Sequence, residues 1–393
     1  MWLAGFFYGH WPWPLETLTR ARDALCRAGL EARVVNVPLG HPGDSLGSRD
    51  GSFPLTPPAH WRLASNRDGK TYAGTSLHAP ATAENAQALR KLRRAGFSHF
   101  FLDDDFRLAR GPGEIGGCFC EEHRARFLRR AGLSAGRWPE LLDDLRARRF
   151  TALLRQWVEF TCDELTGSFR AQQRAAGGGL GIMVMYLGAE KAGIRLADYR
   201  HVPLRVGELM FDDRSFSPLK GKTDELFSVL FHRRFAAPES AYSETTAYPA
   251  DRLSAEHLAA KLVMSTVADV RHTSFMSGVT PFPKTHWTTL APAMRRQAGF
   301  HAQLAGHTLR GPFKHYWGET SRYAGDDHPF SLFLATGVPF ELTDRPARDG
   351  WTFLSDADAA AAANGKLVSR GTRFLCRPSA RAVRGGPGCA PGP

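Results

Sequence analysis

Two apolar runs of this chain end in carboxylates. Residues 97–105 begin with aromatic side chains and close on Asp103, Asp104 and Asp105, and a later short run carries the single carboxylate Glu244. Adjacent like charges repel, so at least one of the three aspartates is expected to hold a proton, whereas a lone carboxylate beside hydroxyl groups is expected to stay ionised. A proton donor paired with an ionised carboxylate suits acid–base and nucleophilic work on a polar, neutral molecule such as a sugar.

A second chemically capable group follows the aspartates. Cys118, Cys120 and His123 have the spacing Cys-x-Cys-x2-His, which can supply three ligands to zinc. Structural zinc sites take four ligands, and no further cysteine lies between Cys26 and Cys118. Two interpretations stay open: a structural zinc that organises this loop without joining the chemistry, or two buried thiols beside the start of a helix.

These residues need a scaffold, and the alternation of patterns predicts one. Short apolar runs alternate with longer stretches of helical periodicity, which is typical of a parallel sheet covered by helices. Eight strand–helix units fit into residues 1–306, which predicts a (β/α)8 TIM barrel of class α/β. The expected strands are residues 3–9, 32–37, 72–78, 97–105, 181–188, 206–212, 241–245 and 272–276. An open nucleotide-binding sheet is the alternative, but no glycine-rich loop joins a strand to a helix.

A long irregular stretch separates the second and third expected strands. Residues 41–70 are rich in Gly, Pro, Ser and Asp, and a loop of that length inside a domain is usually functional. Arg67, Asp68 and Gly69 predict the turn of a β-hairpin within residues 61–72.

Active sites of such barrels lie at the carboxyl ends of the strands, so the polar and aromatic residues there are the candidates for binding. The expected substrate-binding residues at these ends or in the loops beside them are His10, Trp11, Asn36, Trp61, His78, Asp103, Tyr186, Asp212, Asp213 and Trp287. Carboxylates that converge with aromatic rings, without a phosphate-binding loop, predict a carbohydrate substrate.

The segment after the aspartates resembles part of a known enzyme family. Residues 116–128, with a Cys-Phe-Cys cluster and an Ala-x-Phe pattern, are similar to the segment after the acid/base residue in glycoside hydrolase family 42, the β-galactosidase family of clan A. This distant resemblance implies a retaining glycoside hydrolase whose nucleophile is Glu244, on the seventh strand, and whose acid/base is Asp104 or Asp105, on the fourth. The family's Asn-Glu pair is Asp-Asp here, and the third cysteine of its zinc cluster is His123.

Three other functions fit the same barrel. An α-glycosidase-type enzyme would use Asp103 as nucleophile and Asp212 or Asp213 as acid. A metal-dependent hydrolase would use His10, His78 and the aspartates as metal ligands. The third alternative is a barrel that binds carbohydrate without turnover. The peptide labelled by an activated fluorosugar would distinguish the two glycosidase mechanisms. Metal dependence would identify the metal-dependent hydrolase, and binding without turnover would identify the non-catalytic barrel.

The composition and charge of the chain limit the classes of partner that we expect. The chain has 393 residues, 43% of them hydrophobic, and a net charge of +12. No apolar run approaches the roughly 18 residues that cross a bilayer, and the N-terminus has no basic leader, so we expect a cytoplasmic protein without a membrane partner. The positive charge is spread over amphipathic helices, which argues against nucleic acid. No cofactor is expected beyond zinc, and association with further copies of the chain stays open.

The last part of the chain predicts a small appendage. Residues 307–376 contain one further β-α-β unit, too small to be a complete domain. Residues 377–393 consist mainly of Arg, Gly, Ala and Pro without periodicity, which predicts a disordered tail.

Overall fold

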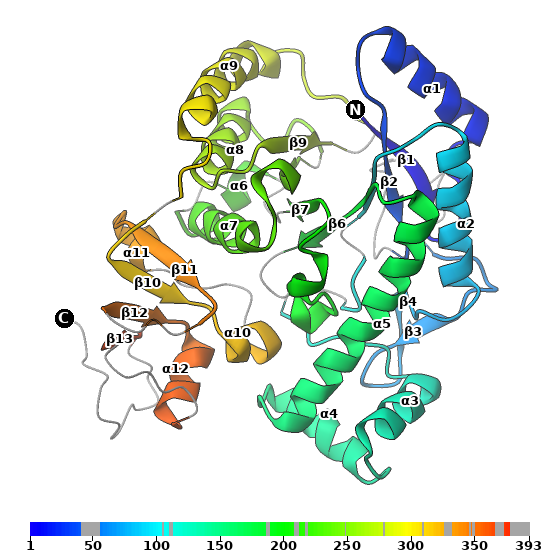
Figure 1. Ribbon diagram of the computed structural model, residues 1–393, viewed down its shortest axis with the longest axis vertical. Coiled ribbons are helices and arrows are strands. Elements are labelled where there is room, and N and C mark those ends of the chain that lie inside the picture. The colour runs from blue at the N-terminus through cyan, green and yellow to red at the C-terminus, as the bar shows by residue number, and fades with distance from the viewer. Residues whose placement is uncertain are drawn as a thin grey trace.

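Runs of β-branched, aromatic and other apolar residues form the strands of the protein, and amphipathic segments between them form helices (Figure 1). The computed structural model describes residues 1–40, 56–103, 106–109, 113–185, 189–207, 212–216, 219–247, 249–277, 280–308, 310–325, 332–345, 347, 350–365 and 373–377. Seven parallel strands form the main sheet, in the order β1 (Trp2–Phe7), β2 (Arg33–Val37), β5 (Phe100–Leu102), β6 (Leu180–Met185), β7 (Leu204–Gly207), β8 (Ala241–Thr246) and β9 (His272–Met276).

Side chains from distant strands of this sheet meet, which shows that the sheet curls. Trp2 of β1 lies 4.8 Å from Phe101 of β5 and 6.5 Å from Tyr242 of β8, measured between ring centroids. The Nη1 atom of Arg33, on β2, donates a hydrogen bond of 2.9 Å to the Tyr242 hydroxyl. A sheet whose first, second and sixth strands touch through its interior is that of a (β/α)8-type barrel, as the sequence predicts.

Helices connect the strands of the sheet along the chain. They are α1 (Leu15–Arg27), α2 (Ala81–Arg94), α3 (Glu121–Ala131), α4 (Arg137–Ala147), α5 (Ala152–Ala176), α6 (Asp213–Phe216), α7 (Leu219–His232), α8 (Ala255–Val267) and α9 (His286–Leu304), with the short 3-10 turns η1 (Glu190–Ala192), η2 (Leu196–Tyr199), η3 (Arg233–Phe235) and η4 (Pro238–Ser240). The longest, α5, begins where the Thr151 side chain accepts a hydrogen bond from the Leu154 amide, and it ends at Gly177, whose φ of 75° suits glycine. None of the described helices is long and apolar enough to span a membrane.

One predicted barrel strand lies elsewhere. The expected third strand, residues 72–78, overlaps β4 (Thr71–Thr75), which pairs antiparallel with β3 (Leu63–Ser65) outside the barrel sheet, and β2 pairs directly with β5. The side chain of Asn66 accepts hydrogen bonds from the amides of Asp68 and Lys70, so the chain turns back on itself. The predicted hairpin is confirmed, and the assignment of its second strand to the barrel was wrong because this local turn decides the pairing.

The C-terminal part forms a separate parallel sheet. Its strands lie in the order β11 (Phe340–Thr343), β10 (Phe313–Tyr316), β12 (Trp351–Leu354) and β13 (Arg373–Leu375), with helices α10 (Glu319–Ala324), α11 (Leu332–Thr336) and α12 (Asp356–Ala363). Of the predicted tail, only Arg377 is among the described residues, and it forms an ion pair with Asp356.

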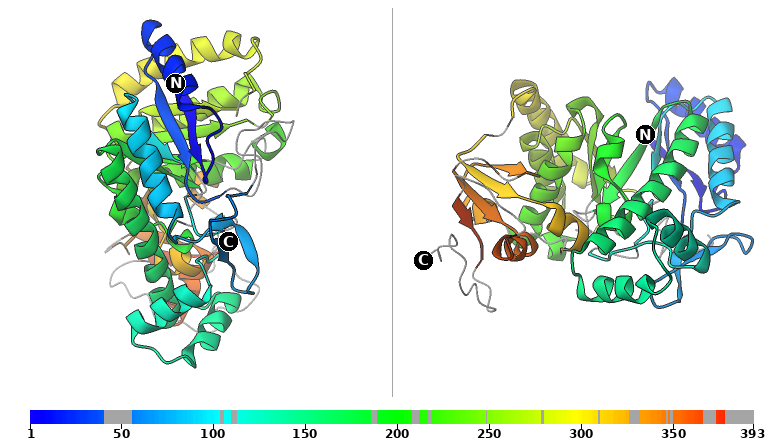
Figure 2. Two further views of the ribbon diagram at one scale, coloured as in Figure 1. Left: turned by 90° about the vertical axis from the view of Figure 1, so that its right-hand side faces the viewer. Right: turned by 60° about the horizontal axis from the view of Figure 1, so that its bottom comes forward.

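The second sheet lies beside the barrel (Figure 2), and buried charges connect the two. Glu190, in the turn after β6, pairs with Arg322 of α10. The Nζ atom of the neighbouring Lys191 donates a hydrogen bond of 2.7 Å to the carbonyl oxygen of Gly325. Glu190 and Lys191 are each 1% exposed, so the contact between the two sheets is part of the folded core.

Candidate active site and metal centre

Strand alternation directs Glu244 into the barrel. Tyr242 and Glu244 share one face of β8, and Tyr242 contacts the rings of the barrel interior. Ser243 points the other way, where its Oγ lies 2.6 Å from that of Ser265 on α8. Glu244 is 1% exposed, and its Oε1 atom accepts a hydrogen bond of 3.1 Å from the Thr246 hydroxyl.

A buried arginine lies between the two carboxylates of the described barrel interior. The Nη1 atom of Arg205, on β7, is 2.8 Å from Oε2 of Glu244, and its Nη2 atom donates to Oδ1 of Asp103. Arg205 is 1% and Asp103 is 6% exposed. We call Asp103, Arg205 and Glu244 the carboxylate centre. A cation this deeply buried requires anionic partners, and this one has two.

Sequence reasoning missed Arg205. A single arginine in the short strand 204–207 resembles a solvent-facing position, because strands with one exposed face carry polar residues in alternation. The sequence offered one signal: this arginine stands in a strand whose other residues are expected to be buried on both faces. Unpaired charges are rare in such strands.

Three predicted site residues fall outside the described part of the chain: Asp104, Asp105 and Tyr186. Their roles stay predictions. Asp103, which directly precedes the first two, donates its backbone amide to the carbonyl oxygen of Asn36 over 2.9 Å, so the end of β5 is fixed beside β2.

Two predicted substrate-binding residues have structural partners instead. Asn36 is buried, and its Oδ1 atom accepts a hydrogen bond of 2.8 Å from the Phe6 amide, which ties β1 to β2. Trp61 is also buried, and its indole NH donates to Glu84 of α2 over 2.9 Å. The Asn36 Oδ1 atom and the Trp61 indole NH therefore both bond within the protein.

Asp212 and Asp213 form hydrogen bonds at the first turns of two helices. Asp212 accepts hydrogen bonds from the amide and hydroxyl of Ser215 at the start of α6, and these bonds lower the pKa of the aspartate. Asp213 accepts from the amide and hydroxyl of Ser254, which begins α8, and its Oδ1 lies 2.6 Å from Nδ1 of His257. These are the helix-capping contacts that such residues commonly make.

The remaining predicted binding residues are scattered. The Nε2 atom of His10 is 3.0 Å from the carbonyl oxygen of Thr56, and Trp11 packs against Phe6 with 5.2 Å between ring centroids. Trp287 is 45% exposed in the first turn of α9.

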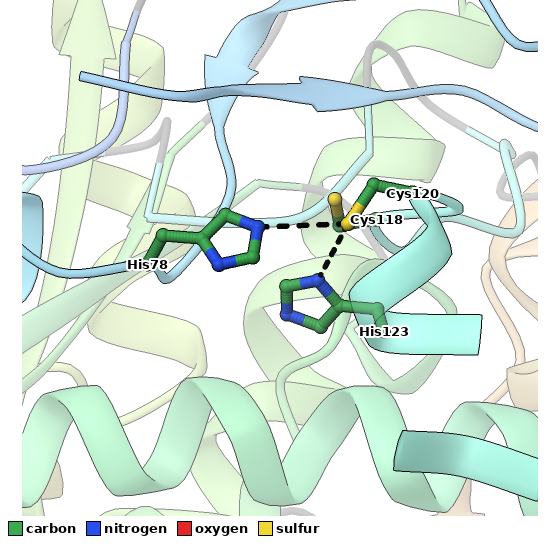
Figure 3. Close-up of side chains that lie close together, drawn as sticks. All are labelled: His78, Cys118, Cys120 and His123. Atoms are coloured by element: carbon green, nitrogen blue, oxygen red, sulfur yellow. Dashed lines mark hydrogen bonds between the residues drawn. The ribbon is translucent and has the colours of Figure 1, made fainter. Parts of the chain in front are cut away.

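The predicted zinc ligands form a cluster with a fourth residue. Cys118, Cys120 and His123 are joined by His78, and the ligand atoms of all four lie within 4.8 Å of one another (Figure 3). The Cys120 sulfur is 3.5 Å from Nε2 of His78 and 3.2 Å from Nδ1 of His123. His78, which we expected at the barrel mouth, lies here instead; we call the four residues the cysteine–histidine centre.

Both imidazoles of this centre turn their outer nitrogen toward a carboxylate. Nδ1 of His78 is 3.0 Å from Oε2 of Glu122, and Nε2 of His123 is 3.7 Å from Oε2 of Glu164. Metal-binding histidines are typically oriented by such carboxylates, which raise the basicity of the ligating nitrogen. The donor set, two thiols and two oriented imidazoles, therefore fits a tetrahedral Zn²⁺.

Burial sets the protonation of this centre. It lowers the pKa of His78 and lowers that of His123 to about 3, so both imidazoles are neutral, the form that binds metal. Burial also raises the pKa of the Cys118 thiol to about 11. That thiol keeps its proton at neutral pH until a cation displaces it.

The cysteine–histidine centre joins two parts of the fold. His78 follows the β3–β4 hairpin, and the cysteines end the loop that leaves β5. The Phe119 amide donates a hydrogen bond of 2.8 Å to the carbonyl oxygen of Ser65 in β3. Gly117 has a φ of 131°, and a Cβ atom there would lie 2.5 Å from the Trp157 ring. Only glycine fits at this position, so the loop packs tightly against Trp157.

One likeness to a solved structure, at a TM-score above 0.5, supports the barrel. A cold-adapted β-galactosidase from Rahnella sp. R3 aligns with a TM-score of 0.53 and 9% identity, covering 94% of this chain and 64% of its own. A GH5_18 protein from Streptomyces cattleya, solved with GlcNAc, aligns with a TM-score of 0.47 and 14% identity, covering 91% and 83%. No family model and no curated protein matches the sequence.

The first likeness is one of fold. It agrees with the predicted barrel and shows no family for this chain. This chain spans less than two thirds of the length of that β-galactosidase.

Proposed function

We propose that this chain is a retaining glycoside hydrolase that acts on a glycoside or an oligosaccharide. Glu244 would be the nucleophile, and Asp104 or Asp105 the acid/base. The observation that carries the proposal is the position of Glu244, a carboxylate on the inner face of β8 that is held by Arg205 and Thr246. The fold likeness to a β-galactosidase adds support for a carbohydrate substrate.

The reaction needs two carboxyl groups with opposite protonation. The aspartic acid would protonate the leaving oxygen while a Glu244 oxygen attacks the anomeric carbon, which breaks the glycosidic bond and forms a glycosyl ester. The aspartate would then take a proton from water, whose oxygen displaces Glu244 and leaves the sugar with its original configuration. No cofactor takes part in either step.

The α-glycosidase-type alternative has less support. It needs Asp103 as nucleophile and Asp212 or Asp213 as acid, but both candidate acids make capping contacts. The metal-dependent hydrolase also loses support, because His78 lies in the cysteine–histidine centre and His10 contacts Thr56. A barrel that binds carbohydrate without turnover remains the second candidate.

We further propose that the cysteine–histidine centre binds a structural zinc ion. Cys118, Cys120, His78 and His123 would hold it, with Glu122 and Glu164 orienting the imidazoles. Bound zinc would link the hairpin to the loop after β5. It would fix the path of the chain after the aspartates and would take no part in catalysis.

Trapping with activated 2-fluoro-sugars tests the assignment of the nucleophile. We expect turnover in a panel of aryl glycosides, and the fluorosugar matching the active glycoside should inactivate the protein and label the peptide that contains Glu244. The Glu244→Gln variant should resist labelling. A label on Asp103 would favour the α-glycosidase-type mechanism, and binding without turnover across the panel would favour the non-catalytic barrel.

Loss of the acid/base leaves a different kinetic signature. Replacing Asp104 or Asp105 by Asn should spare aryl glycosides with good leaving groups, because these need little protonation. Substrates with poor leaving groups should lose most of their turnover in the variant that lacks the true acid.

A further inference from the structure

We infer that Arg205 is a positioning residue, which holds Glu244 in its reactive orientation and charge state and uses Asp103 as its counter-ion. The inference rests on the proposed function. It also removes Asp103 from the set of proton donors, because that carboxylate is committed to the guanidinium.

The guanidinium of Arg205 is fixed on several sides. One terminal nitrogen faces Glu244 and the other faces Asp103. Its Nη2 atom is also 2.9 Å from the Met183 sulfur, and its Cζ atom lies 5.1 Å from the centre of the Phe101 ring. With these contacts, the planar group can present its nitrogens in only one direction, which is how arginine confers geometric specificity.

Glu244 is oriented from both of its oxygens. Arg205 contacts Oε2, and the Thr246 hydroxyl donates to Oε1. A nucleophile held in this way needs little reorganisation before attack, which is the basis of preorganised catalysis.

Further titratable groups of this part of the barrel interior are Tyr242, His272 and Arg33. The Tyr242 ring is 5.1 Å from that of Phe101, and it stacks on His272 of β9 at 4.4 Å. Arg33 contacts the Tyr242 hydroxyl and pairs with Glu31. Arg205 contacts both Asp103 and Glu244 with one guanidinium group.

Removing this cation would leave two buried carboxylates facing each other. One of them should then bind a proton, since an opposite charge at this distance shifts a carboxyl pKa by about 1–3 units and a like charge shifts it in the other direction. In Arg205→Met, the acid limb of the profile of kcat/KM against pH should therefore move upward by about 1–3 pH units. At pH 7, kcat should fall by about 100-fold or more while KM changes little, because the bound sugar does not need Arg205 for contact.

Two further variants separate positioning from mere folding. Arg205→Lys keeps the charge without the two-sided geometry, so its acid limb should return toward the wild-type position while kcat recovers only in part. The double variant Arg205→Met/Asp103→Asn removes one carboxylate together with the cation, so Glu244 no longer faces a like charge. Its acid limb should therefore also move back toward the wild-type position. Lys261→Met is the matched control: it removes an equally buried cation, paired with Glu225 between α7 and α8, and should lower the melting temperature without moving the acid limb.

Thermal unfolding supplies a readout that needs no substrate. A carboxyl whose pKa is raised in the folded state gives stability that is present at low pH and is lost as pH rises through the raised value. The loss of melting temperature in Arg205→Met should therefore be largest near pH 8 and shrink toward pH 5, and Asp103→Asn should relieve it. An unchanged acid limb together with a pH-independent loss of stability would overturn the inference. A wild type without turnover would instead refute the proposed function and leave the thermal test in place.

Discussion

The carboxylate centre and the cysteine–histidine centre are both buried polar clusters beside β5, yet they balance charge in opposite ways. In the first, Arg205 supplies a permanent cation to Asp103 and Glu244. In the second, burial keeps the imidazoles neutral and the Cys118 thiol protonated, so the residues carry little charge until a cation binds. The first should therefore be sensitive to the removal of a side-chain charge, and the second to chelators and pH.

The largest effect should come from the nucleophile itself. Glu244→Ala should reduce turnover by roughly 1,000-fold or more, because the variant lacks the carboxylate that forms the glycosyl ester in the proposed mechanism. Azide should restore part of the activity and give a product of inverted configuration, which can be measured by NMR. Glu225→Gln, at a buried carboxylate outside the centre, serves as control and should keep its turnover. Near wild-type activity of Glu244→Ala would transfer the role to Asp103.

Removing a ligand of the cysteine–histidine centre should be the next largest effect. Cys120→Ser and His78→Ala should each lose bound zinc and destabilise the fold by about 4 kcal/mol, as loss of a structural metal does. Elemental analysis and denaturant unfolding measure the two quantities. Cys162→Ser, at a buried cysteine outside the centre, should retain zinc. Wild-type protein purified without chelators and free of zinc would leave this centre as two buried thiols and two imidazoles.

The pH dependence of zinc binding sharpens the comparison. The Cys118 thiol, whose pKa is about 11, must lose its proton on binding, so affinity should rise by at least about tenfold per pH unit between pH 6 and 8. The pKa of His123 is about 3, so its imidazole is already neutral across this range. The slope of affinity against pH should therefore not change near pH 6.5 on account of His123. Competition with a chromogenic chelator across this range gives the slope. A flat dependence would show that the thiol is not a ligand.

The carboxylates behind the imidazoles should have a smaller effect. Glu122→Gln or Glu164→Gln should weaken zinc affinity by about 10–100-fold while the metal still binds, because each changes the orientation and basicity of one ligand. Glu121→Gln, a neighbouring and exposed position, is the control and should leave the affinity unchanged. Equal affinities in all three variants would assign Glu122 and Glu164 to surface ion pairs.

The smallest effect should lie outside both centres. Asp212→Ala should cost about 1 kcal/mol of stability through loss of the α6 cap and leave kcat unchanged. Thermal unfolding and steady-state kinetics measure the two outcomes. Loss of turnover with unchanged stability would revive the assignment of Asp212 as a catalytic acid.

The sequence predicts the barrel well, because buried runs such as 33–37 and 180–185 read clearly as strands. It predicts less of the two centres, because their members are distant in the chain. His78 lies 42 positions before Cys120, so spacing alone could not identify it as the fourth ligand. Arg205 was missed for a related reason: its partners are distant in the sequence, Glu244 on the neighbouring strand β8 and Asp103 just after β5, two strands away in the sheet.

The contact between the barrel and the second sheet has a consequence for synthesis of the chain. Glu190 and Lys191 find Arg322 and Gly325 more than 130 positions later, and burial raises the pKa of Glu190. The ribosome delivers these partners only after the last barrel helix, α9, has emerged. Until then, the turn after β6 lacks the partners of its two charges. We therefore expect the docking of α10 to be a late step of folding, which completes the burial of Glu190 and Lys191.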